Sequence, residues 1–331
     1  MKLVERIDAM YELGQYLGSD SLRLKDIKQK AFEVNGWFTS EFIDLAIKNI
    51  VEQFLQKDKL HNWAAHYFLD DNICPSNVGI VMAGNIPLVG FHDLLSVFIS
   101  GHRQTIKLSA KDEVLTKYIV EILLEIDPAT QPYFSFGAML KGCDAYIATG
   151  SNNSARYFEY YFGKYPNLIR KNRTSVAILD GHETDLPLSL LADDVHQFFG
   201  LGCRNVTQLY VPINYDFVPL LTAFRKYNYL ADHAKYKNNY DYYLALQIMN
   251  NRYYMTNDSI ILTEDQQPFS AISILHYQYY PDKQLLINKL SCDPNVQCVV
   301  GNGLTEFGDS QKPGLFTYAD GIDTMQFLLS I

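Results

Sequence analysis

The chain has 331 residues, 48% hydrophobic and 20% charged, which is enough apolar material for the cores of two ordinary domains. Its formal net charge of -9 argues against a nucleic-acid-binding surface, because such surfaces neutralise phosphates with Lys and Arg. Residues 1–11 lack a signal-peptide pattern, and no apolar run is long enough to span a membrane. We therefore expect a cytoplasmic protein that binds no nucleic acid.

The cysteines are scattered along the chain without pairwise spacing, at Cys74, Cys143, Cys203, Cys292 and Cys298. An odd number in this arrangement indicates reduced thiols rather than a disulfide framework. No two of them have the close C-x-x-C spacing of a zinc site. We therefore expect neither disulfides nor a bound metal.

Residues 1–70 carry a mainly helical pattern. Ser40 is expected to cap a helix in which apolar residues recur at helical spacing, namely Ile43, Ile47, Ile50 and Phe54. The texture then changes at 72–77, where turn-forming residues link this segment to the rest of the chain.

From residue 78 onward, short apolar runs alternate with helical patterns. Strands are expected at 78–82, 104–108, 145–148, 175–179, 207–211, 259–263, 271–275 and 296–300. Helices are expected around 94–99 and 115–126, from after Ser151 through residue 161, and around 189–199. Strands that alternate with helices favour an α/β protein with a parallel sheet covered on both faces. The expected segments are 1–70, 71–175 and 176–331.

Parallel sheets bind ligands at the carboxyl ends of their strands, which directs attention to the loops after residues 82, 108 and 148. These loops contain Gly84 and Asn85, then Lys107, Ser109 and Lys111, and finally Gly150 and Ser151. The first offers a flexible backbone and an amide donor, and the second offers two cations and a hydroxyl. The third precedes a helix, whose N-terminus suits an anion such as a pyrophosphate. No G-x-G-x-x-G fingerprint follows any strand, and ordinary turns contain similar small polar residues.

A fourth feature is the glycine-rich turn around Cys203. The turn follows the helix expected at 189–199, and Gly200 suits the end of that helix. Arg204 stands next to Cys203, and a neighbouring cation favours the nucleophilic thiolate. The setting alone equally suits a small buried apolar residue. Cys143 is a second candidate nucleophile, although a structural thiol near a turn explains it better.

These four segments, in this order, resemble the aldehyde-dehydrogenase superfamily, and most closely its acyl-CoA reductase branch, which includes the fatty-acyl reductase of bacterial bioluminescence. The resemblance implies that Cys203 is the nucleophile and that Asn85 helps to hold the oxyanion. It implies that Lys107 contacts the adenosine ribose of the cofactor, and that Gly150 and Ser151 contact its pyrophosphate. It also implies a Rossmann-like cofactor domain at 71–175, and a second α/β domain with the catalytic thiol, together with a C-terminal segment, at 176–331.

The sequence departs from the family pattern where a glutamate usually activates water. The strand expected at 175–179 falls at that place, and Ile178 or Leu179 occupies the glutamate position. Asp180 and Glu183 lie nearby in sequence, so a substitute base stays open. The family's later glutamate, which contacts the nicotinamide ribose, has Glu264 as its nearest candidate.

A second candidate for the ribose-contacting glutamate is Glu306. Without the water-activating glutamate, the resemblance implies reduction of an acyl-CoA, with a fatty acyl group expected, to an aldehyde through an acyl-cysteine. The alternatives are a CoA-acylating aldehyde dehydrogenase in the oxidative direction, an enzyme that takes acyl groups from a partner ligase, and a catalytically silent nucleotide-binding scaffold. A homo-oligomer is also open.

The expected cofactor is NADPH, with NADH as the alternative. In the family, an acidic residue three positions after the lysine grips both ribose hydroxyls and favours NAD; here that position is Ala110. Ser109 and the two lysines of the loop could instead hold a 2′-phosphate by charge-assisted hydrogen bonds. Two acids follow, Asp112 and Glu113, and they would blunt the local positive field.

Overall fold

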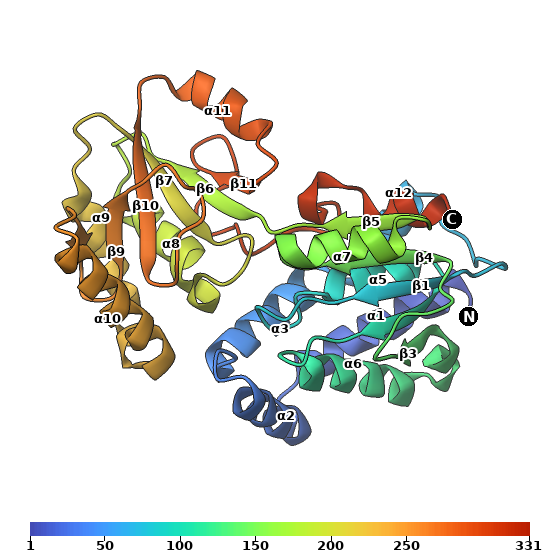
Figure 1. The fold of residues 1–331 in the computed structure, drawn as a ribbon. Helices are drawn as coiled ribbons and strands as arrows, with labels where there is room; N and C mark the ends of the chain where they lie inside the picture. The colour runs from blue at the N-terminus through green and yellow to red at the C-terminus, as the bar shows by residue number, and fades with distance from the viewer. The chain divides into compact units, whose positions relative to one another are not determined.

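The computed structural model describes residues 1–331 as two compact units (Figure 1). Unit 1 contains Met1–Asn172 and Pro313–Ile331, and unit 2 contains Arg173–Lys312. The division falls close to the expected boundary at 175. The last residues differ from the expected division, because they belong to unit 1 and do not continue the third segment. No helix combines the length and the apolar character needed to cross a membrane.

Unit 1 is built on a five-stranded parallel sheet in the order β3-β2-β1-β4-β5. Its strands are β1 (Asn77–Val81), β2 (Arg103–Lys107), β3 (Phe134–Phe136), β4 (Ala145–Thr149) and β5 (Asn167–Arg170). The three strands expected from the sequence are confirmed to within one residue at each end, whereas β3 and β5 were not expected. Both of these are short edge strands, in which the apolar signal is weak.

The helices of unit 1 surround this sheet. They are α1 (Leu3–Leu17), α2 (Leu22–Val34), α3 (Ser40–Gln53), α4 (Lys57–His66), α5 (Phe91–Ile99), α6 (Glu113–Ile126), α7 (Asn152–Phe162) and α12 (Thr324–Leu329), with short 3-10 turns at Pro128–Tyr133 and Ala319–Gly321. The helix expected to follow Ser40 is confirmed, but its cap is Thr39, whose side chain accepts from the Phe42 N–H. Ser40 is instead the first helical residue.

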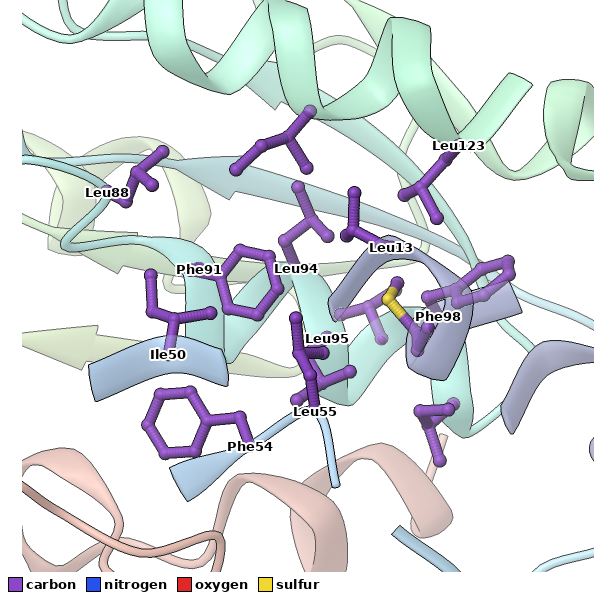
Figure 2. Close-up of a cluster of buried hydrophobic side chains, with 14 of the residues drawn as sticks. Leu13, Ile50, Phe54, Leu55, Leu88, Phe91, Leu94, Leu95, Phe98 and Leu123 are labelled. Atoms are coloured by element: carbon purple, nitrogen blue, oxygen red, sulfur yellow. The ribbon is translucent and has the colours of Figure 1, made fainter. Parts of the chain in front are cut away.

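The helical segment 1–70 shares one core with the helices that flank the sheet. Leu13 of α1 and Ile50 of α3 pack into the same buried cluster as Phe91 and Phe98 of α5 and Leu123 of α6 (Figure 2). All five side chains are nearly inaccessible to solvent. Because a lone amphipathic helix is marginal in water, this shared burial is what holds the N-terminal helices in place.

Unit 2 contains a six-stranded sheet in the order β11-β6-β7-β10-β9-β8, parallel except for β8. Its strands are β6 (Thr174–Ile178), β7 (Val206–Pro212), β8 (Met255–Thr256), β9 (Ile261–Glu264), β10 (Ile274–Tyr280) and β11 (Val296–Val300). Its helices are α8 (Asp185–His196), α9 (Phe217–Phe224), α10 (Ala234–Met249) and α11 (Lys283–Ser291), with 3-10 turns at Gln197–Gly200 and Arg225–Asp232. The expected α/β fold class is therefore confirmed in both units.

Three expected elements of unit 2 are displaced. The strand expected at 259–263 begins only at Ile261. The strand expected at 271–275 begins only at Ile274, because Ser273 has a left-handed φ of 65° and the Ile274 N–H closes a turn onto Ala271. The helix expected to reach residue 199 ends at His196, because Phe198 and Phe199 have left-handed φ values of 54° and 57°. In the last two places the expected element runs across a backbone reversal that the apolar pattern does not reveal.

A buried ion pair in unit 1 generates a stability prediction. Arg170 forms hydrogen bonds of 2.8 and 2.6 Å to the two carboxylate oxygens of Asp93 and one of 2.7 Å to Thr324, which ties β5 to α5 and α12. Asp93→Ala should lower the free energy of unfolding by about 3–5 kcal/mol, because it leaves a buried guanidinium without its carboxylate. Urea unfolding measures this loss. Arg23→Ala, which breaks an exposed pair with Glu121, should have a far smaller effect.

Candidate active site

The three candidate binding loops of unit 1 lie at one edge of its sheet. Because β1 is parallel to both β2 and β4, with Val81 level with Lys107 and with Ala148, the chain leaves these strands on the same side. The loops therefore bring Asn85, Lys107 and Ser151 to that edge. β2 and β4 flank β1 on opposite sides, which is the switch point where α/β sheets bind ligands.

The loop after β2 presents its cations and its hydroxyl to solvent. Lys107 and Lys111 are exposed, and Ser109 is half-buried. The Ser109 Oγ accepts a hydrogen bond of 3.3 Å from the Lys111 N–H, so the hydroxyl hydrogen stays available for a ligand oxygen. These side chains fit a phosphate or a ribose.

The sequence predicted that the two acids after Lys111 would blunt this positive field. In the structure both acids are engaged in other contacts. Asp112 is only 5% exposed, and its Oδ2 accepts a hydrogen bond of 2.7 Å from the Leu88 N–H. Burial raises the pKa of Asp112 well above its ordinary value, which favours the neutral acid. Glu113 forms an ion pair with Lys117, one turn further along α6. Burial of Asp112 and pairing of Glu113 with Lys117 therefore weaken the negative field that these acids set against an anion at the loop.

The loop after β4 leads into α7 at its N-terminus. Ser151 is the N-cap residue, and its Oγ accepts from the Ser154 N–H at 3.2 Å. Gly150 precedes it and donates its N–H to the Arg170 carbonyl at 3.3 Å. The first backbone N–H groups of a helix attract anions, so the place suits a pyrophosphate.

Cys203 lies in a closed turn directly before β7. The Asn205 N–H donates to the Gly202 carbonyl at 3.1 Å, and the Gly202 N–H donates to the Asn205 Oδ1 at 2.8 Å. The Asn205 Nδ2 also donates to the carbonyls of Asp194 and Gln197, at 3.1 and 2.8 Å. Because Asn205 is fully buried, these bonds fix the turn to the end of α8.

A second contact holds the Cys203 backbone. The Ser175 Oγ donates to the Cys203 carbonyl at 3.1 Å, and the Cys298 thiol donates to the same Ser175 Oγ at 3.0 Å. Arg204 forms a hydrogen bond with the Cys298 thiol, and its charge counteracts the burial that raises the pKa of Cys298. The structure therefore places Arg204 beside the thiol of Cys298, whereas its effect on Cys203 stays a prediction.

The second candidate nucleophile, Cys143, lies at the edge of the unit 1 sheet opposite the candidate binding loops. Cys143 precedes β4, and its sulfur accepts a hydrogen bond of 3.7 Å from the Asn77 side chain at the start of β1. This is the amino edge of the sheet in unit 1, opposite the binding loops. Cys143 is 3% exposed, and burial raises the pKa of its thiol. These properties suit a structural residue.

Asp180 and Glu183 lie too far from Cys203 to act as a substitute base in unit 2. β6 and β7 are parallel, with Ser175 level with Val206, so Cys203 is at the amino edge and Asp180 at the carboxyl edge. The five residues from Ser175 to Asp180 span roughly 16 Å in a strand. Asp180 instead forms an ion pair of 2.9 Å with Lys283.

Glu183 is also engaged locally, because it accepts from the Gly181 N–H at 3.1 Å. The two residues at the family's glutamate position, Ile178 and Leu179, are fully buried and apolar. The substitute base left open by the sequence is therefore not supplied by Asp180 or Glu183.

The two candidate ribose-contacting glutamates lie at the end of β9 and in the loop after β11. Hydrogen bonds tie the neighbouring backbone to β7 and to Asp194 of α8. Glu264 is exposed at the end of β9, and the next residue, Asp265, accepts at its carbonyl from the Gln208 side chain of β7 at 3.0 Å. Glu306 is exposed in the loop after β11. That loop is held by the buried carboxylate of Asp194, which accepts from the Gly308 N–H at 2.7 Å and from the Ser310 N–H at 3.1 Å.

A small cavity lies behind the thiol turn, within unit 2. Its volume is about 20 Å³, which leaves room for about one water molecule. His196 and Phe199 line it together with Thr207 of β7 and Tyr236 of α10. Burial lowers the pKa of His196 to about 4, and its Nδ1 lies 2.9 Å from the Ala192 carbonyl, so the ring is neutral.

Sequence reasoning missed the residues that hold the thiol turn: Ser175, Asp194, Asn205 and Cys298. Asn205 alone carried a signal, because Asn between a glycine-rich turn and a strand is typical of side-chain-to-backbone bonding. The other three come from separate elements and have no common motif.

The fold of this chain is similar to the folds of solved aldehyde dehydrogenases. Aldehyde dehydrogenase 21 from Physcomitrella patens, in complex with the reaction product succinate, has a TM-score of 0.65 and 12% identity, covering 91% of this chain and 74% of that chain. Succinic semialdehyde dehydrogenase from Streptococcus pyogenes, with NADP+ as the cofactor, has a TM-score of 0.64 and 13% identity, covering 90% and 76%. An aldehyde dehydrogenase from Mycobacterium tuberculosis complexed with NAD+ has a TM-score of 0.59 and 13% identity, covering 89% and 72%.

The chain therefore has the aldehyde-dehydrogenase fold, as the sequence predicted. No family model matches it, and no curated protein matches it in sequence. At these identities the likeness establishes the fold, while the resemblance to the acyl-CoA reductase branch continues to rest on the sequence motifs.

The buried carboxyl of Asp194 generates a pH prediction. Burial raises its pKa to about 6 from 3.8, so the folded state binds this proton more tightly than the unfolded chain does. The resulting stability is present below about pH 4 and is lost as the pH rises through about 6. Relative to Asp194→Asn, which cannot titrate, the wild type should therefore lose on the order of 3 kcal/mol between pH 4 and pH 7. Urea unfolding across this range measures the difference, and a constant difference would contradict the assignment.

Proposed function

We propose that the protein is an NADPH-dependent reductase that converts an acyl-CoA to an aldehyde through an acyl-cysteine on Cys203. The observation that carries the proposal is the thiol turn, in which a fully buried Asn205 fixes the backbone on both sides of Cys203. A nucleophile needs such positioning, because small misplacements cost large factors in rate. The fold and the loop edge of unit 1 support the same chemistry.

The first half-reaction uses side chains of this chain. The thiolate of Cys203 attacks the thioester carbonyl, and the oxygen of the tetrahedral adduct takes up the negative charge. The Asn85 amide and the Cys203 backbone N–H donate to this oxygen, which is the role that the family resemblance implies. CoA leaves as its thiolate and takes up a proton, and the acyl group stays on the sulfur of Cys203.

A bound nicotinamide nucleotide would supply the hydride that reduces the acyl group to the aldehyde, which releases Cys203 as its thiolate. Lys107 would hold the adenosine ribose, and Gly150 and Ser151 would hold the pyrophosphate at the start of α7. Ser109 and Lys111 would hold the 2′-phosphate. Two exposed lysines, a hydroxyl hydrogen free to donate, and buried or paired acids around them support this assignment of roles.

The arrangement of unit 2 supports thioester chemistry over oxidation of an aldehyde to an acid. Hydrolysis of an acyl-cysteine needs a base that activates water near the sulfur. Asp180 and Glu183 lie at the opposite edge of the sheet from Cys203 and are engaged by Lys283 and by backbone N–H groups. Without a base that activates water, an acyl-cysteine persists until hydride transfer reduces it.

A fatty acyl group is the expected substrate, as in the reductase branch that the motifs resemble. The same site could run in the oxidative direction as a CoA-acylating aldehyde dehydrogenase, or could receive its acyl group from a partner ligase. A silent nucleotide-binding scaffold would need no fixed thiol turn. Aldehyde production from acyl-CoA substrates of graded chain length, with each nucleotide, distinguishes these alternatives.

The nucleophile is tested by substituting Cys203. Wild-type protein incubated with an acyl-CoA in the absence of nucleotide should gain one acyl mass, and peptide mapping should place it on Cys203. Cys203→Ala should lose this adduct and all aldehyde formation while its thermal unfolding stays close to that of the wild type, because the residue is only partly buried.

Cys143→Ala provides the matched control, because it removes another thiol that is buried in unit 1. It should keep the adduct and the turnover, after allowance for any loss of stability. Normal turnover by Cys203→Ala would overturn the proposed function.

The nucleotide preference is tested by comparing kcat/KM for NADPH and NADH. We expect an advantage of at least tenfold for NADPH, which corresponds to about 1.4 kcal/mol of transition-state stabilisation. Lys111→Ala should shrink this ratio by reducing the NADPH value, since it removes one of the cations assigned to the 2′-phosphate. A ratio that favours NADH, or one that Lys111→Ala leaves unchanged, would show that this loop does not bind the phosphate.

A further inference from the structure

Asp112 stands at the N-cap position of α6 but does not cap that helix. Its side chain makes no capping hydrogen bond to the first turn of α6. An aspartate in this position usually bonds the N2 or N3 N–H and so stabilises its helix. Here the carboxyl is turned away from the helix and buried, so it serves some other contact.

That contact is with the loop after β1. The Asp112 Oδ2 accepts from the Leu88 N–H at 2.7 Å, and both residues are only 5% exposed. Leu88 has a left-handed φ of 57°, a conformation that a branched aliphatic residue rarely adopts without support. The hydrogen bond therefore holds the far end of the loop that begins with Gly84 and Asn85.

The near end of the same loop is packed against the same segment. A Cβ atom at Gly84 would lie 2.6 Å from the Ser109 Oγ and 3.3 Å from the Asp112 Cβ, so only glycine fits there. The Met82 N–H donates to the Lys107 carbonyl at 3.0 Å, which continues the pairing of β1 and β2. The Asn85 loop and the lysine loop thus form one body.

The Asp112 carboxyl lies in an environment that is energetically unfavourable for the carboxyl group itself. Its Oδ1 is buried without a hydrogen-bond partner, and burial raises the pKa of the group well above its ordinary value. A buried carboxyl with one unsatisfied oxygen destabilises the folded state. A side chain that serves only stability would not be arranged in this way, which indicates that the position of the loop is what the residue supplies.

We propose that Asp112 is a positioning residue that sets the Asn85 amide for acyl transfer, by pinning the Asn85 loop to the nucleotide-binding loop through the Leu88 N–H. The proposal rests on the proposed function, because it takes the role of Asn85 from it. Asp112 is buried, so the role proposed for it is to act through Asn85 and not on the substrate directly.

The test is a double-mutant cycle on the rate of acyl-enzyme formation, followed by mass spectrometry after rapid quenching without nucleotide. Asn85→Ala should slow acylation by about 10²-fold, the usual effect of losing one oxyanion donor. Asp112→Ala should slow it at least tenfold. The double variant should be no slower than Asn85→Ala within a factor of three, because both substitutions remove the same interaction.

Three further measurements separate positioning from general damage. Asp112→Asn keeps an oxygen acceptor for the Leu88 N–H and the shape of a neutral carboxyl, so it should restore the rate to within threefold of the wild type. Asp127→Ala, at the other end of α6, removes a half-buried aspartate that accepts from the Ala129 N–H and should change the rate less than twofold. Hydrogen exchange of the peptide covering 83–91 should be at least tenfold faster in Asp112→Ala.

The outcomes are distinct. Additive effects in the cycle, unchanged exchange at 83–91, or an Asp112→Asn variant as slow as Asp112→Ala would each overturn the positioning role while leaving the proposed function standing. A wild-type chain that forms no acyl-enzyme would overturn the proposed function and this inference with it. If Asp112→Ala fails to fold, Asp112→Ser replaces it in the cycle. The serine side chain is shorter than that of aspartate and does not reach the Leu88 N–H.

Discussion

In a parallel sheet the chain enters every strand at one edge of the sheet and leaves it at the opposite edge. Both units of this chain are built almost entirely from parallel strands. In unit 1 the rule brings the loops after β1, β2 and β4 to one edge, whatever their separation in sequence. In unit 2 it places the turn with Cys203 at the amino end of β7 and Asp180 beyond the carboxyl end of β6. The same constraint thus assembles one set of candidate groups and separates another, and it decides which residues can share a reaction.

Those parts of the fold that depend on local apolar pattern could be predicted from the sequence. The strand at 296–300 has the bounds expected for it, and the strands that become β1, β2 and β4 differ by no more than one residue at each end. The errors fall where the apolar signal is weak, as in β3 and β5, and where the backbone turns within an expected element. Ser273 interrupts an apolar run in a left-handed conformation, and Phe198 and Phe199 do the same after α8. An aromatic or hydroxyl residue with positive φ has no sequence signature, because surrounding packing imposes it.

The candidate site was predictable to the level of loops and no further. Asn85, Lys107 and Cys203 stand in short motifs, and a motif can be found by eye. The contacts that fix those motifs join distant parts of the chain, as when the Asp194 carboxylate holds the Gly308 N–H. Asp112 shows the limit most plainly, because its sequence context predicts an exposed acid at a helix start, whereas the fold buries it against Leu88. Burial favours the neutral acid over the carboxylate and gives the side chain a role that its sequence context does not suggest.

Both candidate segments break local rules in the same way. The loop of Asn85 ends in a left-handed Leu88 supported by an imperfectly satisfied carboxyl, and the turn of Cys203 follows two left-handed phenylalanines and is fastened by a fully buried amide. Each arrangement orders a short backbone segment at the expense of favourable local geometry, and buried polar side chains hold it there. Strain of this kind persists only where the surroundings over-determine it, and it gathers at places where a reacting group must be held still. Under the proposed function, one of these places would carry the amide that donates to the oxyanion and the other the nucleophilic thiol.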